Sequence, residues 1–389
     1  MTRNLNKPTE SQIPQPSTVT TTTLAPLVQY AMQNSKIQVL NWHHEQLHGG
    51  VGKGTAIYRY SGDSEDHGRK IPWSLILKTV QPSGNRSVHA WDYYKREVDA
   101  YQSGWLNTLP GGLSAPRLFG VTESADGTCW IWLEDVNNDV ADPWPLAHYR
   151  VVARHIGQLN GTFLTQETLP DHSWLSRDWI RHYVEQSAPC IDLLHQSQDH
   201  PLVRRWLPEE LMKRVFHLWD DRDLFLNALD RLPQTICHFD VHRRNLFARR
   251  VTVQQFETLL IDWAFVGHGP VGADLNPLMN ASVAFFDVDV ADAQRFEDLI
   301  FEGYLTGLHD VGWDGNRQDV RLGYAASCVR YALGTLGPVL MMIFDQNSRL
   351  QAEQAFHCSI GDLLNYWGHI RHYFGYMEDE ARRLIKLTS

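Results

Sequence analysis

The sequence predicts an α+β protein of two lobes, a small β-rich N-terminal lobe with one helix and a larger, mainly helical C-terminal lobe. Two observations lead to this fold class. Short runs of alternating apolar and polar residues, punctuated by Gly, fill the chain from about residue 36 to residue 135. Beyond residue 138 most segments carry apolar residues at helical spacing instead. We therefore expect a tail at 1–25, an N-lobe at 26–135 and a C-lobe at 136–389.

Composition and charge limit the class of protein. The chain has 389 residues, 43% of them hydrophobic, which is enough to build two substantial cores. Its formal net charge of −10 offers no basic face for a nucleic acid and is compatible with a cationic small substrate. We expect no nucleic-acid partner, and the sequence does not indicate an oligomeric state.

The cysteines and the apolar segments indicate the cellular compartment of the protein. The five cysteines are an odd number without a CxxC pair, so they predict neither a disulfide framework nor a zinc site. No early segment has the basic-then-apolar pattern of a signal peptide. The apolar run at 334–344 is too short to span a bilayer. We expect a cytoplasmic protein without a membrane partner.

The first lobe is expected to hold five strands and one helix. The preceding tail, 1–25, is polar, Pro-bearing and Thr-rich, which predicts disorder. The helix is expected at 87–106, with Glu97 at the border of an apolar stripe. That stripe consists of Tyr94, Val98, Tyr101 and Trp105. The strand-like runs are 38–50, 55–62, 73–80, 115–124 and 128–136.

Helical periodicity dominates the second lobe. Its only clear β signal is a pair of runs, NLFARR at 245–250 and FETLLID at 256–262, joined by a short loop. No internal repeat is found. The segments with helical spacing are 151–164, 176–188, 209–229, 293–305 and 320–334.

The polar groups around this β pair carry the candidate chemistry. CHFDVHRRNLF, residues 237–247, contains a His, then Asp240, then Asn245 five residues after the Asp. Asp262 ends the returning run LLID, and an antiparallel hairpin would bring residues 245 and 262 close together. A carboxylate that accepts a proton and two oxygen ligands for Mg²⁺ are groups that phosphoryl transfer requires.

These segments resemble a known family. CHFDVHRRNLF and LLIDWAFVGHGPVGADL are similar to the catalytic and metal-binding motifs of the aminoglycoside phosphotransferase and choline kinase superfamily. The resemblance covers most of the chain after the tail. It implies a protein-kinase-like fold, ATP and Mg²⁺ as cofactors, Asp240 as the catalytic base, and Asn245 and Asp262 as metal ligands.

The resemblance also implies structural rather than catalytic roles for two residues of these motifs, and at two places the sequence differs from the family pattern. It implies that His238 orients the loop and that Asp274 ties the loop to the following helix. Phe239 stands where the family usually has Gly, and Arg243 and Arg244 stand where it has Pro-Gly. The spacing from the Asp to the Asn is unchanged, but the contacts of this loop with a substrate are left open.

A nucleotide site is expected in the N-lobe. HGGVGKGTAIYRY is rich in Gly, and Gly50 and Gly52 are candidates for close approach of backbone N–H groups to phosphates, with a plain hairpin as the alternative. A Walker A loop is disfavoured because Lys53 is followed by Gly54 and then by a strand-like run. In this family the segment that corresponds to 130–136 is the hinge between the lobes. The resemblance implies that its main chain, including that of Glu134 and Val136, contacts adenine. A buried strand without a ligand is the alternative, because its sequence would have the same pattern.

Lys78 and Glu97 are expected to form the ion pair that positions the α- and β-phosphates. Lys78 shares a strand face with Ile76 and Val80, an apolar setting in which an ammonium group needs a partner. Glu97 supplies one by analogy with the lysine and glutamate pair of kinases. A lysine at a sheet edge and an ordinary solvated helix charge remain the alternatives.

The motifs favour a small-molecule kinase over a protein kinase. Only twelve residues separate Asp262 from Asp274, and Trp263 and Ala264 replace the Phe-Gly of protein kinases, so no activation segment fits. We expect an ATP- and Mg²⁺-dependent O-phosphotransferase with a small hydroxyl acceptor, an aminoglycoside-like amino sugar being favoured. An inactive kinase-like protein that binds a nucleotide or small ligand, and a protein kinase, are the alternatives.

Overall fold

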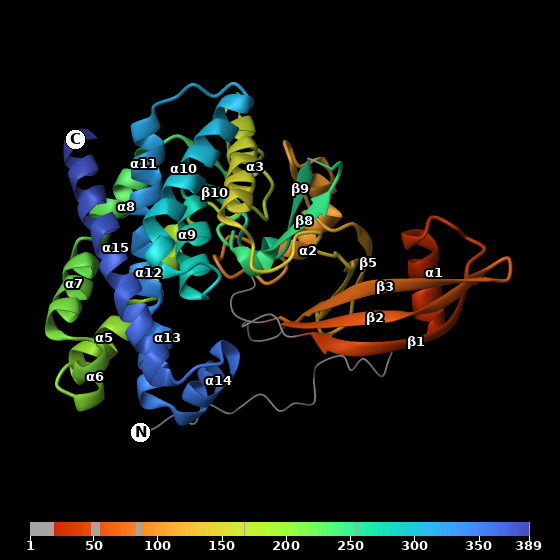
Figure 1. Ribbon diagram of the computed structural model, residues 1–389, viewed down its shortest axis with the longest axis horizontal. Coiled ribbons are helices and arrows are strands. Elements are labelled where there is room, and N and C mark those ends of the chain that lie inside the picture. Colours follow the sequence, from red (N-terminus) through yellow and green to blue (C-terminus); the bar gives the residue numbers. More distant parts are fainter. Residues whose placement is uncertain (1–18, 48–54, 83–86, 167, 254, 389) are drawn as a thin grey trace. The chain divides into compact units, whose positions relative to one another are not determined.

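The computed structural model describes residues 19–47, 55–82, 87–166, 168–253 and 255–388, which form two compact units. Unit 1 extends to Thr108 and includes Ala115–Asn137, whereas unit 2 contains Leu109–Ser114 and Asn138–Ser389. Unit 1 is built around a sheet and unit 2 is mainly helical (Figure 1). The expected α+β fold class is thereby confirmed.

Unit 1 contains a five-stranded antiparallel sheet with the order β1-β2-β3-β6-β5. Each strand coincides with one of the five runs expected from alternation, because half-buried strands keep apolar residues on one face. The strands are β1 (Gln38–Leu47), β2 (Thr55–Asp66), β3 (Arg69–Val80), β5 (Leu118–Glu123) and β6 (Cys129–Glu134).

The two faces of strand β3 have different partners. Leu75 and Leu77 point into a core that helix α1 (Thr21–Ala31) completes with Leu24 and Val28. Figure 1 shows α1 lying across the strands of this sheet. Lys78 has the opposite parity and lies on the other face, where helix α2 supplies its partner.

The end of the expected tail and the N-lobe helix differ from expectation, whereas residues 1–18 of that tail lie outside the described residues. Residues 21–25 are helical rather than disordered, because the Oγ1 atom of Thr20 caps α1 by accepting from the Thr23 N–H, and the apolar residues that follow bury the helix. Helix α2 spans only Arg96–Gln102, not 87–106. The guanidinium of Arg96 is buried and donates to the carbonyls of Ala90 and Trp91, which holds the preceding segment in turns.

Unit 2 contains two small sheets and most of the helices. The expected hairpin is present as β8 (Leu246–Arg250) and β9 (Phe256–Leu260). A third strand, β4 (Leu113–Ser114), pairs with β9 in parallel. A second pair, β7 (Gln234–Cys237) with β10 (Gly267–Pro270), was not expected, since strands of four residues or fewer leave almost no alternation to detect.

Each segment with helical spacing forms helix over most of its length, although residues 176–178 precede the helix that begins at Trp179. The runs at 209–229 and 320–334 are each divided into two helices. The bounds are α3 (Leu146–Leu164), α4 (Trp179–Glu185), α5 (Ala188–Ser197), α6 (Pro201–Trp206), α7 (Glu209–Asp220), α8 (Arg222–Arg231), α9 (Leu275–Ala284), α10 (Ala293–Asp310), α11 (Arg317–Ala326), α12 (Cys328–Gly334), α13 (Leu336–Phe344), α14 (Gln346–Phe356) and α15 (Ile360–Thr388).

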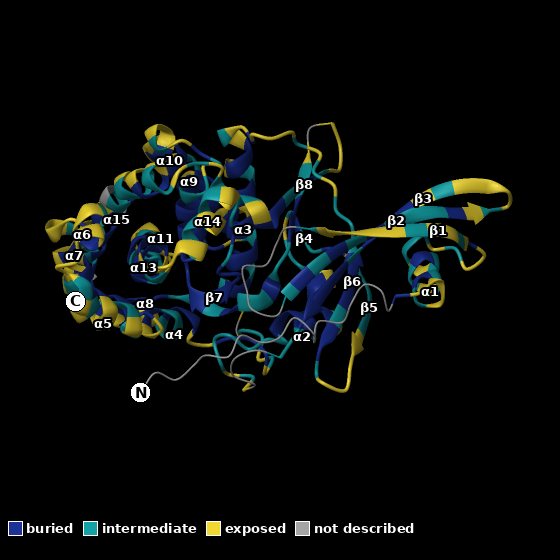
Figure 2. Ribbon diagram, turned by 90° about the horizontal axis from the view of Figure 1, so that it is seen from below, coloured by how far each residue is buried: buried dark blue, intermediate teal, exposed yellow. Residues whose placement is uncertain are grey.

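Burial is uneven among these helices. The stretch Arg317–Phe344 is long and apolar enough to cross a membrane by length and composition alone, but it comprises α11, α12 and α13, and 56% of its most apolar 18-residue window is buried inside the protein. Helix α14, by contrast, carries no buried residue, and Figure 2 shows it as exposed or intermediate. The core of unit 2 therefore does not extend through α14.

Close backbone packing joins α10 to α3, the helix that packs against β7. A Cβ atom on Gly307 of α10 would lie 1.9 Å from the carbonyl oxygen of Arg154 in α3. A Cβ atom on Gly157 of α3 would lie 2.2 Å from the carbonyl oxygen of Tyr304 in α10. The two helix backbones touch only because both positions lack a side chain.

We predict that Gly307→Ala destabilises the protein by about 1–3 kcal/mol, because the added methyl forces α3 and α10 apart. Gly368→Ala in α15 is the matched control, since a Cβ atom there meets no heavy atom within 4 Å. The control should be neutral or stabilising by up to ~1 kcal/mol, the intrinsic gain of Ala over Gly in a helix. Urea unfolding of both variants measures this difference, and equal effects would show that the packing is not as tight as described.

Candidate active site

The hairpin places the candidate catalytic and metal-binding residues on neighbouring turns. After β7 ends, the chain runs through His238–His242 into a short 3-10 helix, η4 (Arg243–Asn245), and then into β8. On the returning side, the N–H of Ile261 donates to the carbonyl of Asn245 at 3.0 Å. The backbones around residues 245 and 262 are thus adjacent, as the spacing predicted.

Asn245 is the best-defined member of the site. It is 7% exposed, and its Nδ2 group donates to the carboxylate of Asp240 at 2.9 Å and to the Asp240 carbonyl at 3.0 Å. The same group lies 3.2 Å from Nε2 of His242. Because the two oxygen atoms of Asp240 fix the amino side of the amide, the oxygen of Asn245 faces away from them and receives no hydrogen bond from a described residue.

The Asp240 carboxylate is surrounded by positive and donor groups. Its side chain is 21% exposed, with His242 Nε2 at 3.5 Å and Arg330 Nη2 at 3.7 Å. Burial acts to raise the pKa of Asp240, but the hydrogen bond and charge of His242, together with the charge of Arg330, outweigh burial and leave that pKa below its ordinary value. The carboxylate is therefore ionised at neutral pH and can accept a hydrogen bond.

His238 and Asp274 hold the loop through its backbone. The buried Asp274 carboxylate accepts from the N–H groups of His238 at 3.1 Å and Phe239 at 2.8 Å. Nδ1 of His238 accepts from the Asp240 N–H at 3.2 Å, while Nε2 donates to the carbonyl of Ile261 at 3.1 Å, which defines a neutral tautomer. Burial lowers the pKa of His238 to about 4, so the ring stays neutral.

Two residues of the site have positive φ angles. Phe239 has φ 66° and Asp262 has φ 64°, a conformation that residues other than Gly adopt rarely and at a cost of about 1–3 kcal/mol. The Phe239 ring stacks on Trp179 with centroids 5.0 Å apart and fills the space that a side chain on Gly269 would occupy. This buried aromatic contact offsets the strain where the related motif has Gly.

Arg330 is a site residue that the sequence did not indicate. It lies on α12, is 6% exposed, and its guanidinium stands 4.1 Å from the ring centroid of Trp179. From there Nη1 donates to the carbonyl of Phe239 while Nη2 approaches Asp240. No motif or spacing marks a single arginine in an apolar helix, so only the folded chain shows its place beside the loop.

In unit 1 the expected ion pair is present. Nζ of Lys78 lies 2.5 Å from Oε2 of Glu97, and the two side chains are 10% and 4% exposed. A buried lysine and glutamate in contact exclude both alternatives, a lysine at a solvated sheet edge and a free helix charge. Unit 1 thus holds a fixed ammonium group on β3.

The structure gives less support to the other residues of unit 1 that were expected to contact the nucleotide. Gly50 and Gly52 lie outside the residues that the structure describes. Glu134 ends β6, and its N–H donates to the carbonyl of Arg117 at 2.9 Å, so that N–H is not available to a ligand while the sheet is intact. Val136 follows β6 in the segment that leaves the sheet.

Comparison with known proteins places the chain in a family. The model of the phosphotransferase enzyme family matches residues 74–312, more than half of the chain. The chain belongs to the phosphotransferase enzyme family. It is a small-molecule kinase, and membership implies a nucleotide as one substrate. Among curated proteins, none matches this kinase.

Solved structures share the fold of this kinase. A choline kinase from Cryptosporidium parvum Iowa II aligns with TM-score 0.53 and 13% identity over 89% of this chain and 94% of its own. An amicoumacin kinase in complex with AMP-PNP and Ca²⁺ aligns with TM-score 0.52 and 13% identity over 85% and 88%. The GDP complex of an aminoglycoside 2′-phosphotransferase IIIa mutant aligns with TM-score 0.51 and 11% identity over 92% and 100%. At these identities the likeness shows the fold alone.

We predict that Arg330→Met lowers kcat of the kinase by about 10–100-fold, because Asp240 loses its positioning and the Phe239 carbonyl loses its donor. The KM for the nucleotide should stay nearly unchanged. In an Asp240→Asn background the same substitution should cause little further loss, since Arg330 acts through Asp240. Arg317→Met, which removes an exposed arginine stacked on Phe301, is the control. Equal losses in both backgrounds would assign Arg330 a general structural role.

Proposed function

We propose that the protein transfers the γ-phosphoryl group of ATP, with Mg²⁺, to a hydroxyl group of a small molecule. The observation that carries this proposal is the hydrogen bond from Asn245 to Asp240, which turns an amide oxygen and a carboxylate outward from one rigid loop. This is the arrangement that a proton acceptor next to a metal ligand requires.

Asp240 is the residue proposed to meet the acceptor hydroxyl. Because its pKa is held below the ordinary value, it is a weak base that first orients the hydroxyl by accepting its hydrogen bond. It takes the proton as the bond to phosphorus forms, which suits a loose transition state in which proton transfer comes late. Arg330 and His242 then stabilise the loop around the carboxylate and keep its orientation.

Asn245 and Asp262 are proposed to hold the metal. The fit rests on donor chemistry, because the amide oxygen of Asn245 is left without a donor and Asp262 adds a carboxylate after the paired strand. Mg²⁺ prefers such oxygen ligands. When bound, it supplies positive charge to the phosphates during transfer. Positive φ at Asp262 turns the chain sharply after β9, which sets the direction of this carboxylate.

Lys78 is proposed to bind the α- and β-phosphates, with Glu97 holding its ammonium group in place. Gly50, Gly52, Val136 and the carbonyl of Glu134 remain proposed contacts to the nucleotide. A cytoplasmic location is also part of the proposal, and the free state of all five cysteines supports it. The expected absence of nucleic-acid and membrane partners stays a prediction.

The proposal is tested by following ADP release from Mg-ATP with a panel of hydroxylated compounds. Acceptor-dependent ADP release that EDTA abolishes is expected. Asp240→Asn should fold normally and lose about 10²–10⁴-fold in kcat, since an amide of similar shape cannot accept the proton.

Asp298→Asn, an exposed carboxylate on α10, serves as the control and should keep full turnover. Near-normal turnover of Asp240→Asn, with chemistry shown to be rate-limiting, would reject Asp240 as the base. A protein that binds ATP but releases no ADP with any acceptor would favour an inactive nucleotide-binding protein instead.

We predict that Lys78→Ala raises the KM for ATP or lowers kcat, and that Glu97→Ala gives a milder defect of the same kind. The reason is that Glu97 acts only through Lys78, to which it is bound at 2.5 Å. A double-mutant cycle on kcat/KM measures the coupling directly. Strictly additive losses would mean that the pair does not function as a unit.

A further inference from the structure

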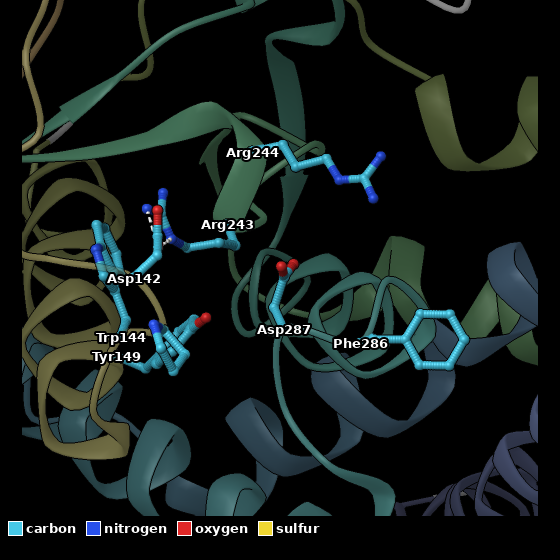
Figure 3. A pocket seen from close by; sticks show the side chains of 8 residues that line it. Asp142, Trp144, Tyr149, Arg243, Arg244, Phe286 and Asp287 are labelled. Carbon is cyan, nitrogen blue, oxygen red and sulfur yellow. Dashed lines mark hydrogen bonds and ion pairs between the residues drawn. The ribbon is translucent and has the colours of Figure 1, made fainter. Parts of the chain in front are cut away.

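Two adjoining cavities lie beside the catalytic loop, both inside unit 2. The first, cavity A, has a volume of about 390 Å³ and lies among the residues labelled in Figure 3. The second, cavity B, has about 340 Å³ and is walled by Phe285, Phe286 and Phe356. Arg244 and Phe286 line both cavities. The ring of His242, whose Nε2 lies 3.5 Å from Asp240, has its centroid 5.6 Å from that of Phe285 in the wall of cavity B, so the cavities border the catalytic loop.

Arg243 contributes little free charge to cavity A. Its guanidinium donates to the carboxylate of Asp142 at 3.0 and 2.5 Å and to the carbonyl of Leu246 at 2.8 Å. It also stacks 3.9 Å from the ring centroid of Trp144. Figure 3 shows Arg243 and Asp142 joined at one side of the cavity. The positive charge is neutralised and its direction is fixed.

Arg244, unlike Arg243, has no acceptor bonded to its guanidinium group among the described residues. It is exposed, and it makes no salt bridge or hydrogen bond with any residue that the structure describes. Its guanidinium lies 4.2 Å from the ring centroid of Phe285 and 5.9 Å from that of Phe356. A stacked guanidinium keeps its N–H edge free for an oxygen atom of a ligand. The junction of cavities A and B therefore presents a guanidinium group that no carboxylate binds directly, with Asp287 within range of its charge.

Cavity A also contains two polar atoms that lack partners. Tyr149 is completely buried, and its hydroxyl makes no hydrogen bond with a described residue. Oδ2 of Asp287 is buried and equally without a partner, and Figure 3 shows this carboxylate directed toward the space between the two arginines. Unpaired buried polar atoms are costly, so a ligand that bonds to both would recover that free energy.

The balance of charges limits the class of ligand. Among the residues that line cavity A, two carboxylates face two guanidinium groups, and only Asp287 is left to attract a cation. A polycation needs several unpaired carboxylates, and the guanidinium of Arg244 on the face of Phe285 repels a second cation there. An uncharged molecule can bond to both Asp287 and Arg244, and an anionic group gains only where it meets Arg244 away from the Asp287 carboxylate.

We propose that the acceptor is an amphiphilic alcohol without net positive charge, whose hydroxylated part binds Tyr149 and Asp287 in cavity A. Its apolar or aryl part lies along Phe285, Phe286 and Phe356 in cavity B, and an oxygen-bearing group between the two parts meets Arg244. The combined size suits a ligand of the usual small-molecule class. This proposal rests on the proposed function and differs from the amino sugar that the sequence favoured.

The test uses four glycosides as probes in isothermal titration calorimetry. Three share a p-nitrophenyl group and differ in the charge of the sugar: the β-D-glucuronide, the β-D-glucoside and the β-D-glucosaminide. The fourth, methyl β-D-glucoside, lacks the aryl group. We expect the glucuronide and the glucoside to bind at least about tenfold more tightly than the glucosaminide. We expect methyl glucoside to bind about tenfold more weakly than its aryl counterpart, because it leaves cavity B empty.

Charge reversal at Arg244 gives the decisive comparison. In Arg244→Glu the order of the glucuronide and the glucosaminide should invert. Arg205→Glu, which reverses another exposed arginine stacked on an aromatic ring, should leave the order unchanged. Tightest binding of the glucosaminide to the wild type, an order unaltered by Arg244→Glu, or no measurable binding of any aryl probe would each overturn the proposal.

The same probes separate this proposal from the proposed function. Asp240→Asn should lose turnover but keep the binding order, because all four probes carry hydroxyl groups and the substitution leaves Arg244 and the walls of cavity B unchanged. If acceptor-dependent ADP release occurs but the binding order fails, only the acceptor class is wrong. If the binding order holds but the wild type never releases ADP from Mg-ATP, the acceptor class is supported as a ligand class and the kinase reaction is rejected.

Discussion

The site depends on one buried carboxylate. Asp274, at the start of α9, is completely buried and accepts hydrogen bonds from two successive backbone N–H groups of the catalytic loop. Asn160 of α3 approaches the same carboxylate and also donates to the carbonyl of Ile236 in β7. A buried charge is tolerated only when such donors surround it. One carboxylate thus ties α3, β7, α9 and the loop together, and the position of Asp240 follows from that arrangement.

The support of this carboxylate extends into the helix core. The hydroxyl of Tyr304 on α10 donates to Oδ1 of Asn160 at 2.6 Å and accepts from the N–H of Gly272 at 3.0 Å. The contact of α3 with α10 through glycines brings these groups into range. Packing between two helices is therefore transmitted to the loop by a short series of buried hydrogen bonds, each of which fixes the orientation of the next.

The second constraint is the placement of the arginine side chains around the catalytic loop. Three arginines approach it, and each is held on an aromatic face: Arg330 on Trp179, Arg243 on Trp144 and Arg244 on Phe285. Arg330 acts inward on Asp240 and the Phe239 carbonyl, and Arg243 is neutralised by Asp142. Only Arg244 remains directed toward open space. The departures from the family motif are thus part of one aromatic and cationic layer around the loop.

The fold class, the spacing of Asp240 and Asn245 and the hairpin that returns to Asp262 could be predicted from the sequence, because they are local or follow from period-two alternation and helical spacing. The pairing of Lys78 with Glu97 was expected only by analogy with kinases, since the two residues lie on different elements. The sequence did not determine the helix at Thr21–Ala31, the shortened α2, the role of Arg330 or the charge state around Arg243 and Arg244. Those outcomes depend on contacts between residues far apart in the chain, such as Arg330 with Phe239 or Arg243 with Asp142. Only the tertiary structure brings such partners together and decides which charges are neutralised.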